Sequence, residues 1–383
     1  MSLTETDYDG REQSAIKHFV LRLYLEAAAR ILGTTRNLKY IDCCAGPWET
    51  KSARFEDASF GIAVRTLKEA SVDLAKRNRS PQLACLFIER DTEAFRKLDA
   101  FAKESDSSAV RVHARNWDFS ERQDDIVRYC TGRNTFPFIF IDPTGWQLAG
   151  ISKIRGLLHL NPGEVLINLM SPFIARFIKD NRTDFSDLLG SDFPELRRLS
   201  GSKLEYEIVR KYCEMIRDEG GFEYVCSLPI MNPDNDSFNF HLIYATRHRK
   251  GVEVFKDVER RTAKMTAELR ASVQSRARHQ KTGNFELFTP EVQYRENRYQ
   301  ELVEDNIVRA GSLVFQMLKT LGEATYDDCW AEALQHSGVF EDDLREWIRI
   351  WQESGDVLVH GKPPKDRTLK FGRGITLSYC GTS

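Results

Sequence analysis

The chain has 383 residues, of which 41% are hydrophobic and 29% charged. This composition is typical of a globular protein, and the length predicts two or three domains. With 55 Lys and Arg against 57 Asp and Glu, the formal charge of −2 excludes a chain that attracts polyanions by its overall charge, although a local basic patch can still do so. No apolar run approaches the ~20 residues of a membrane span, and the polar start MSLTETDYDGREQ does not resemble a signal peptide.

The eight cysteines include no C-x-x-C pair, which argues against a zinc or iron–sulfur site. Cys85 and Cys226 lie inside apolar runs and are expected to be reduced core residues. We therefore expect no metal site, no contact with a membrane, and a cytoplasmic location, where thiols stay reduced.

Strand and helix patterns alternate five times in about the first 170 residues. After an N-terminal helix, strands are expected at LKYID, LACLFIE, VRVHAR, FPFIFID and GEVLINLM, with amphipathic stretches between them. This alternation predicts right-handed crossovers and a parallel sheet covered by helices on both faces. Two further strands, YVCSLPIM and FNFHLIYATRH, flank the turn NPDND and predict an antiparallel hairpin at the sheet edge. Seven strands ending in a hairpin are typical of class I S-adenosylmethionine (SAM) methyltransferases, so we predict an α/β, Rossmann-like sheet of that class.

The composition changes after the seventh strand. Residues 247–281 hold eleven Lys and Arg against four Asp and Glu, a local charge of +7. From about residue 312, three short helix patterns precede two strands around a basic, Pro-rich turn, which is the order of a winged helix. We predict a methyltransferase-like domain with its N-terminal helix in 1–250, a basic helical linker in 251–300, and a winged-helix-like α+β domain in 301–383.

In an open parallel sheet, ligands bind beyond the carboxyl ends of the strands, so the residues after each strand are candidate site residues. The first strand ends in DCCAGPW. Asp42 is expected to hold the amino end of SAM, Gly46 allows close approach of the backbone, and Cys43 and Ala45 complete this cofactor turn. The alternative is a plain tight turn capped by Asp42.

The second and third strands are followed by further polar candidates for cofactor binding. A carboxylate such as Glu89, next to Arg90, can accept hydrogen bonds from both ribose hydroxyls. Asn116, Trp117 and Asp118 are expected to meet the adenine. The alternatives are a solvated acid that caps the next helix, and a turn with Trp117 plugged into the core.

The fourth strand is followed directly by the candidate catalytic residues. Pro143 fixes φ and forces Asp142 into an extended conformation. Gly145 leaves room, and Trp146 offers a flat surface for a flipped or single-stranded base. Asp142 and the Pro143 carbonyl are expected to orient a nucleobase amine toward the methyl donor, since positioning does most of the work in such a transfer. The alternative is an Asp-Pro turn with an aromatic lid and no substrate.

These motifs carry a family resemblance. The chain resembles the three-Cys-motif partner (TcmP) family, bacterial and phage proteins with a SAM-methyltransferase-like domain. The resemblance rests on Lys17-His18, YIDCCAGPW at 40–48, FIERD at 87–91, FIDPTGW at 140–146 and LIYATRHRKG at 242–251. It implies SAM as cofactor, with Lys17 among its binding residues, and a three-Cys radical-SAM-like protein as a partner. The element Asp142-Pro143-Thr144-Gly145 also resembles a motif of tRNA guanine-N2 methyltransferases and the D-P-P-Y/W signature of amino methyltransferases.

Charged segments outside the sheet do not decide whether the protein binds nucleic acid. The +7 stretch is either a nucleic-acid track or a solvated helix. A basic turn near the C-terminus favours nucleic acid, whereas the acids 341–343, on the helix that would enter a groove, repel phosphate. The turn holds Lys362, Lys365, Arg367, Lys370 and Arg373.

Two functions follow. The first is a SAM-dependent N-methyltransferase that acts on a nucleobase amine in RNA or DNA, with residues 142–145 holding the amine. The second is a catalytically silent methyltransferase-like protein that serves as a partner of a three-Cys radical-SAM-like protein.

Overall fold

A computed structural model describes residues 11–46, 50, 52, 55–180, 182–282 and 297–381, without the side chains of 277–282 and 297. Residues 47–49 of the predicted cofactor turn, including Trp48, and residues 283–296 of the predicted linker lie outside these residues. The chain divides into two compact units, Met1–Tyr294 and Arg295–Ser383. The three-part division into 1–250, 251–300 and 301–383 stays a prediction.

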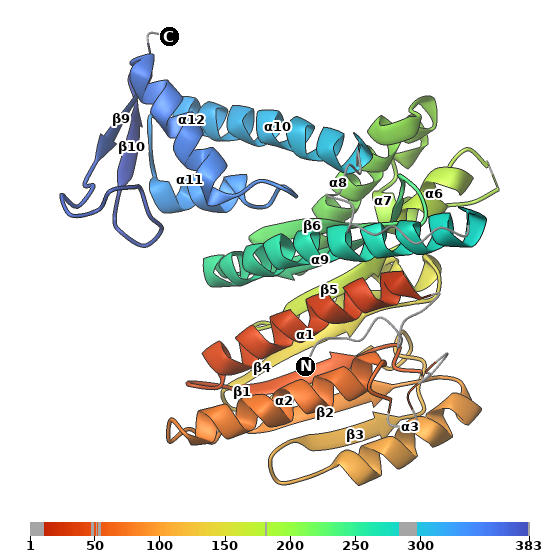
Figure 1. The fold of residues 1–383 in the computed structure, drawn as a ribbon. Coiled ribbons are helices and arrows are strands. Elements are labelled where there is room, and N and C mark those ends of the chain that lie inside the picture. The colour runs from red at the N-terminus through yellow and green to blue at the C-terminus, as the bar shows by residue number, and fades with distance from the viewer. Residues whose placement is uncertain are drawn as a thin grey trace. The chain divides into compact units, whose positions relative to one another are not determined.

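The first unit is built on a seven-stranded sheet with the order β3-β2-β1-β4-β5-β7-β6 (Figure 1). Strands β1 to β5 run parallel, β7 is antiparallel to β5, and β6 pairs antiparallel with β7. The strands are β1 (Asn37–Asp42), β2 (Leu83–Ile88), β3 (Arg111–Arg115), β4 (Thr135–Ile141), β5 (Glu164–Leu169), β6 (Tyr224–Met231) and β7 (Phe238–Thr246). The predicted α/β class, with a mostly parallel seven-stranded sheet, is confirmed.

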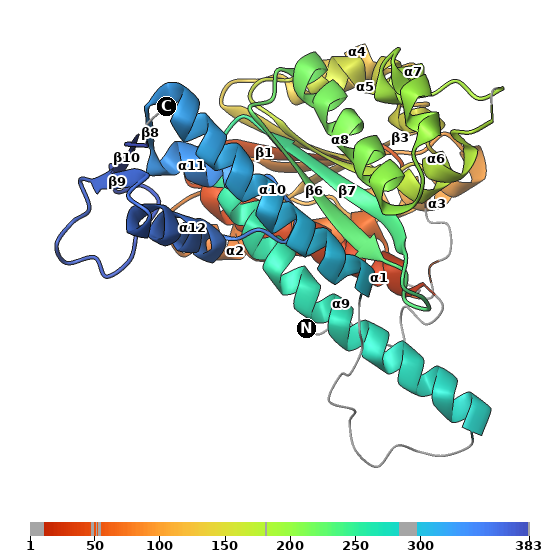
Figure 2. The ribbon, with the colours of Figure 1, turned by 90° about the horizontal axis from the view of Figure 1, so that it is seen from above.

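Helices cover both faces of the sheet, as Figure 2 shows. On one face lie α1 (Glu12–Leu32), α2 (Ser59–Ala75) and α9 (Arg249–Thr282), and on the other α4 (Gln123–Cys130), α5 (Ile151–Leu158) and α8 (Gly201–Gly220). Helix α3 (Thr92–Ser105) packs beside β3, while α6 (Ser171–Phe177) and α7 (Ser186–Leu189) pack on α8. Two 3₁₀ turns, η2 (Gln147–Ala149) and η3 (Phe193–Arg198), complete the unit. Every residue of β2, β4 and β5 is buried, because helices shield both faces, and this explains why these strands are continuous apolar runs.

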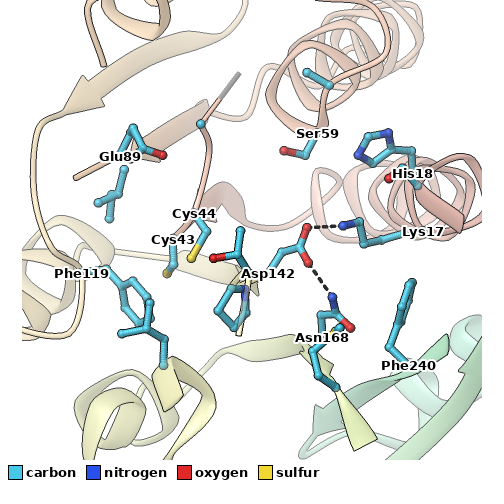
Figure 3. Close-up of a pocket in the computed structure, with 18 of the residues that line it drawn as sticks. Lys17, His18, Cys43, Cys44, Ser59, Glu89, Phe119, Asp142, Asn168 and Phe240 are labelled. Atoms are coloured by element: carbon cyan, nitrogen blue, oxygen red, sulfur yellow. Dashed lines mark hydrogen bonds and ion pairs between the residues drawn. The ribbon is translucent and has the colours of Figure 1, made fainter. Parts of the chain in front are cut away.

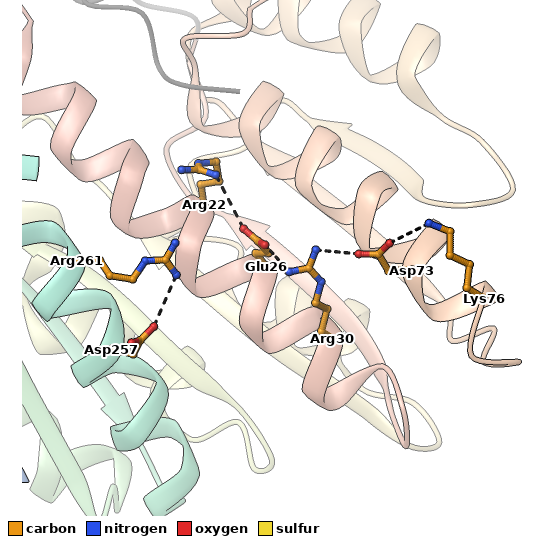
Figure 4. Close-up of polar contacts among 7 residues, drawn as sticks. All are labelled: Arg22, Glu26, Arg30, Asp73, Lys76, Asp257 and Arg261. Atoms are coloured by element: carbon orange, nitrogen blue, oxygen red, sulfur yellow. Dashed lines mark hydrogen bonds and ion pairs between the residues drawn. The ribbon is translucent and has the colours of Figure 1, made fainter.

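Helices α1 and α2 lie side by side, and their outer surfaces are joined by ion pairs (Figure 4). Arg30 on α1 pairs with Glu26 in its own helix and with Asp73 on α2, the latter at 2.8 Å. Asp73 also meets Lys76 at 3.6 Å. Such partly exposed pairs stabilise a fold by about 1 kcal/mol or less each, so the apolar contact between these helices dominates their packing.

The basic stretch that continues from β7 forms α9, and several of its residues are inside the protein. Val252 and Phe255 are buried against the sheet side, with the Phe255 ring stacked on Tyr244 at 4.6 Å. Lys256 is buried and paired with Glu259. Part of the local positive charge is therefore neutralised by the fold and does not face the solvent.

The second unit contains α10 (Asn297–Leu321), α11 (Tyr326–Ala333) and α12 (Glu341–Glu353), with a three-stranded antiparallel sheet. Its strands β8 (Glu323–Thr325), β9 (Val357–His360) and β10 (Thr376–Tyr379) have the order β8-β10-β9. Thr325 begins α11 with a capping box, since its hydroxyl accepts the Asp328 N–H at 3.0 Å. The winged-helix assignment stays a prediction. Among the described residues, no helix is long and apolar enough to span a membrane.

Candidate functional site

The carboxyl ends of β1, β2, β4 and β5 meet at one edge of the sheet, where they surround a pocket of about 410 Å³ (Figure 3). The first turns of α1 and the start of α2 close it on one side, and β7 contributes Asn239 and Phe240. The volume is within the range of small-molecule sites, roughly 300–1,000 Å³. This position, beyond the strand ends, is the one expected for ligands of an open parallel sheet.

Asp142 lies in this pocket directly after β4 and is held from two sides. Its Oδ2 atom forms an ion pair with Lys17 of α1, and its Oδ1 atom accepts a hydrogen bond from Nδ2 of Asn168 at 2.7 Å (Figure 3). The side chains of Lys17 and Asp142 are only 14% and 17% exposed. The carboxylate is therefore fixed in one orientation at the edge of the pocket.

Asn168 was missed by the sequence reasoning. It lies in β5 and is buried, and its Oδ1 atom has no hydrogen-bond partner among the described residues. A single amide inside the apolar run EVLINLM was the available signal. A buried amide oxygen without a partner destabilises a fold, so this acceptor is a candidate to receive a hydrogen bond from a ligand.

Asp42 lies beneath the pocket and does not line it. It is fully buried, and its carboxylate accepts hydrogen bonds from the Ser59 hydroxyl at 2.6 Å, the Cys44 N–H at 3.2 Å and the Tyr40 hydroxyl at 3.2 Å. The pKa of Asp42 is raised to about 6, because burial and the nearby charge of Asp142 raise it by more than the hydrogen bonds from Ser59, Cys44 and Tyr40 lower it. Asp42 therefore fixes the first-strand turn to the start of α2, and it is Ser59 that reaches the pocket.

The rest of the first-strand turn is divided between pocket and core. Cys43, Cys44 and Gly46 line the pocket. Ala45 is buried, and its N–H donates to the carbonyl of Ile88 at 2.9 Å. Burial raises the pKa of both cysteine thiols well above the usual range, so neither is a thiolate at neutral pH.

The loop after β2 places Glu89 and Arg90 in the pocket lining. The Glu89 carboxylate accepts the Asp91 N–H at 2.6 Å. Burial raises the pKa of Glu89, whereas the hydrogen bonds from the backbone of Asp91 and Arg90 lower it. The carboxylate is thus largely desolvated and anchored by its own loop. Asp91 itself caps α3 by accepting the Ala94 N–H at 2.8 Å, so the cap role belongs to Asp91.

The loop after β3 contributes Trp117, Asp118 and Phe119 to the lining. Asn116 does not line the pocket, because its Nδ2 group donates to the carbonyls of Glu89 at 2.8 Å and Arg90 at 3.0 Å. It ties the two loops together. Trp117 both lines the pocket and packs against the hydrophobic core.

The remaining residues of the element after β4 point in different directions. Pro143 and Thr144 line the pocket, whereas Gly145 is exposed and a side chain built there meets no atom within 4 Å. Trp146 lies outside the lining, with its ring against Phe185 at 4.7 Å between centroids. The aromatic surface inside the pocket comes from Trp117, Phe119 and Phe240.

Basic residues in and directly before the first turns of α1 complete the pocket. His18 is buried next to Lys17, and burial together with the charges of Lys17 and Arg11 lowers its pKa well below the usual value, so it is neutral. Arg11 lines the pocket and pairs with Asp57. Within the described ranges, no group of three or more His, Cys, Asp or Glu residues is arranged to hold a metal ion.

Comparison with known proteins adds little to this picture. No protein-family model matches the chain, and neither does any curated protein sequence. Among solved structures, a Legionella pneumophila protein of the DUF519 family model is 11% identical, with a TM-score of 0.40 over 68% of this chain and 93% of its own. The SAM-bound O-methyltransferase TomG of Streptomyces achromogenes, involved in tomaymycin synthesis, is 13% identical, with a TM-score of 0.31 over 59% of this chain and 79% of its own. By its strand order and its antiparallel β7, the first unit has a methyltransferase-like fold. Membership of the TcmP family stays a prediction.

Proposed function

We propose that the protein is a SAM-dependent N-methyltransferase that acts on a nucleobase amine in RNA or DNA. The observation that carries the proposal is the chain Lys17–Asp142–Asn168, which fixes a carboxylate in a pocket beyond the ends of the parallel strands. Glu89 lines the same pocket. Two strand ends thus each bring a carboxylate to the pocket. We assign Glu89, after β2, to a cofactor half of the site, and Asp142-Pro143, after β4, to a substrate half.

The residues of the cofactor half fit SAM. Glu89 suits the ribose diol, Asp118 suits the exocyclic amine of adenine, and Lys17 suits the carboxylate of the methionine moiety. Apolar walls for the nucleoside come from Ile88, Phe119 and Leu148. When bound, SAM would supply an electrophilic methyl group, and the sulfonium that carries it would depart as a neutral thioether.

The substrate half uses acceptors of this chain. The Asp142 carboxylate and the Pro143 carbonyl accept the two amine hydrogens, so the nitrogen lone pair points away from both of them and toward the methyl donor. Asn168 keeps the carboxylate in this orientation. After the new N–C bond forms, the amine loses one proton, and Asp142 is the acceptor nearest to it. Phe240 provides an apolar surface for the ring of a flipped base.

One observation favours the silent alternative, in which the fold serves as a partner of a three-Cys radical-SAM-like protein. The ammonium of Lys17 already pairs with the carboxylate that a substrate amine needs. A catalytic site requires this pair to open or to share the carboxylate. In a silent protein, the pair is a permanent link between α1 and β4.

Thermal unfolding with and without SAM tests the proposal. Ligand that binds only the folded state stabilises it by about 2.7 kcal/mol at 100 times its Kd, which raises the melting temperature by several degrees. We expect such a rise at 1 mM SAM, and transfer of labelled methyl groups from SAM to an RNA or DNA pool. The absence of any shift at millimolar SAM would overturn the proposal and favour the silent protein.

A further inference from the structure

A pair of exposed phenylalanines lies next to the substrate half of the pocket. Helix α6 begins directly after Met170, which lines the pocket, and β5 before it carries Asn168. With a rise of about 1.5 Å per residue, Phe173 lies roughly 5 Å and Phe177 roughly 10 Å along the helix from Met170. Both residues are therefore within reach of a chain that enters the pocket.

The geometry of α6 turns these two side chains outward. Ile174 and Ile178 are fully buried on the side where α6 packs on α8 and β7. Phe173 and Phe177, one helical turn apart on the other side, are 40% and 36% exposed, with ring centroids 4.5 Å apart. The two neighbouring rings therefore offer one continuous, partly exposed aromatic surface on this side of α6.

Two cations accompany the rings. Arg176 and Lys179 are exposed, and neither forms an ion pair or hydrogen bond with any residue that the structure describes. By contrast, Arg182 just beyond is paired with Asp180 at 3.2 Å. The surface around the rings thus carries positive charge that no described residue neutralises, and this charge favours a negatively charged ligand.

We propose that Phe173, Phe177, Arg176 and Lys179 form a binding surface for single-stranded nucleic acid that flanks the target base. Aromatic rings that stack on bases, combined with cations that contact phosphates, are the recognition chemistry of single strands. The surface deepens the proposed function, on which it rests, because it names an unpaired strand as the substrate form. The base in the pocket and its neighbour on α6 are then consecutive in one strand.

Fluorescence anisotropy with labelled 12-nucleotide single-stranded RNA and DNA tests this surface. The double variant Phe173→Ala/Phe177→Ala should bind at least tenfold more weakly, and Phe173→Trp/Phe177→Trp should restore binding, because tryptophan stacks on bases as well. The matched control is Ile31→Ala/Val72→Ala, which removes two exposed apolar side chains of α1 and α2 and should change binding less than twofold. Thermal unfolding checks that each variant is folded.

The charged pair gives an independent readout. Arg176→Gln/Lys179→Gln should reduce the slope of log affinity against log salt by about 1.4, since each phosphate contact to a single strand contributes about 0.7. An affinity unchanged by the phenylalanine variants, or no oligonucleotide binding at all, would overturn the inference and leave the rings as a surface for another protein. The proposed function does not depend on the phenylalanine variants, so a protein that binds SAM and transfers methyl groups to RNA or DNA, but whose affinity these variants leave unchanged, retains it.

Discussion

Lys17, in the second turn of α1, forms an ion pair with Asp142, which follows β4 and lies 125 residues later in the chain. Both side chains are largely shielded from solvent, so the attraction between them is stronger than that of a surface pair. The pair connects the N-terminal helix to the strand that carries the proposed acceptor of the amine. It makes Lys17 a part of both halves of the site.

Replacing Lys17 with methionine should therefore reduce both SAM binding and methyl transfer. Loss of a charge-assisted hydrogen bond costs about 1.5–3 kcal/mol, which corresponds to a roughly 10- to 150-fold weaker affinity for SAM. Lys17→Arg keeps the charge and should retain most of the affinity. Isothermal titration with SAM measures the effect, and Lys103→Met, which removes an exposed lysine paired with Asp99, is the control. Unchanged affinity in Lys17→Met would exclude Lys17 from the cofactor half.

Replacing Asp142 should separate catalysis from cofactor binding. Asp142→Ala removes the acceptor that orients the amine, and losses of this kind are about 100- to 1,000-fold in kcat. The SAM affinity should stay within about threefold of the wild type, because Glu89 and Asp118 remain. Single-turnover transfer of labelled methyl groups and SAM titration measure the two effects. Full turnover in Asp142→Ala, with Asp99→Ala as the surface control, would show that this carboxylate is not the acceptor.

A change at Asn168 tests its role as the residue that positions Asp142. Asn168→Asp places a second carboxylate 2.7 Å from the first, and the two like charges repel. We expect kcat at pH 8 to fall at least tenfold relative to the wild type. At pH 5.5 the loss should be smaller, because one proton shared between the carboxylates restores a hydrogen bond. A merely structural role predicts a loss that does not change with pH.

The sequence predicted the sheet and the strand-end acids because both depend on local pattern. Asp142 and Glu89 come directly after buried apolar runs, and parallel strands bring such positions to one edge. Ser59 and Phe240 lie on α2 and on the antiparallel β7, so only the packing of distant segments brings them to the pocket.

The sequence also does not determine which side chains near a strand end face the pocket. Trp146 is four residues after Asp142, yet its ring packs on Phe185, a residue of a later segment that no local pattern links to it. Asp42 was expected at the cofactor, but α2 covers it, and Ser59 takes its place at the surface of the pocket. In both cases a long-range contact decides which side chain faces the ligand.

Glu89 should matter for cofactor binding more than for the reaction step. Glu89→Ala removes an acceptor from the proposed ribose site and should weaken SAM binding about 10- to 100-fold, the effect of losing one or two hydrogen bonds to a charged group. At saturating SAM, kcat should fall less than threefold. Glu93→Ala, on the exposed first turn of α3, is the matched control. A defect in kcat with normal SAM affinity would move Glu89 to the substrate half.

The buried Asp42 should make the stability of the first unit depend on pH. Its pKa rises from 3.8 to about 6 on folding, so between these values the folded protein binds more protons than the unfolded chain. The free energy of unfolding therefore decreases as the pH rises from about 4 to 6, by about 3 kcal/mol for this group at about 1.4 kcal/mol per pH unit. The decrease is complete by about pH 7, and below about pH 4 this group contributes no further change, because it is protonated in both states.

Urea denaturation of the wild type and Asp42→Asn over this pH range measures the effect. Glu89 and Glu164 also have raised pKa values, but they are present in both proteins, so their contributions cancel in the difference. The difference in unfolding free energy should move by about 3 kcal/mol in favour of the asparagine variant between pH 4 and 7. In Ser59→Ala, which removes a hydrogen bond that lowers the pKa of Asp42, the decrease should extend to higher pH. A difference that is constant across this range would mean that Asp42 is already ionised in the folded protein at pH 4, and that the turn beneath the pocket is hydrated.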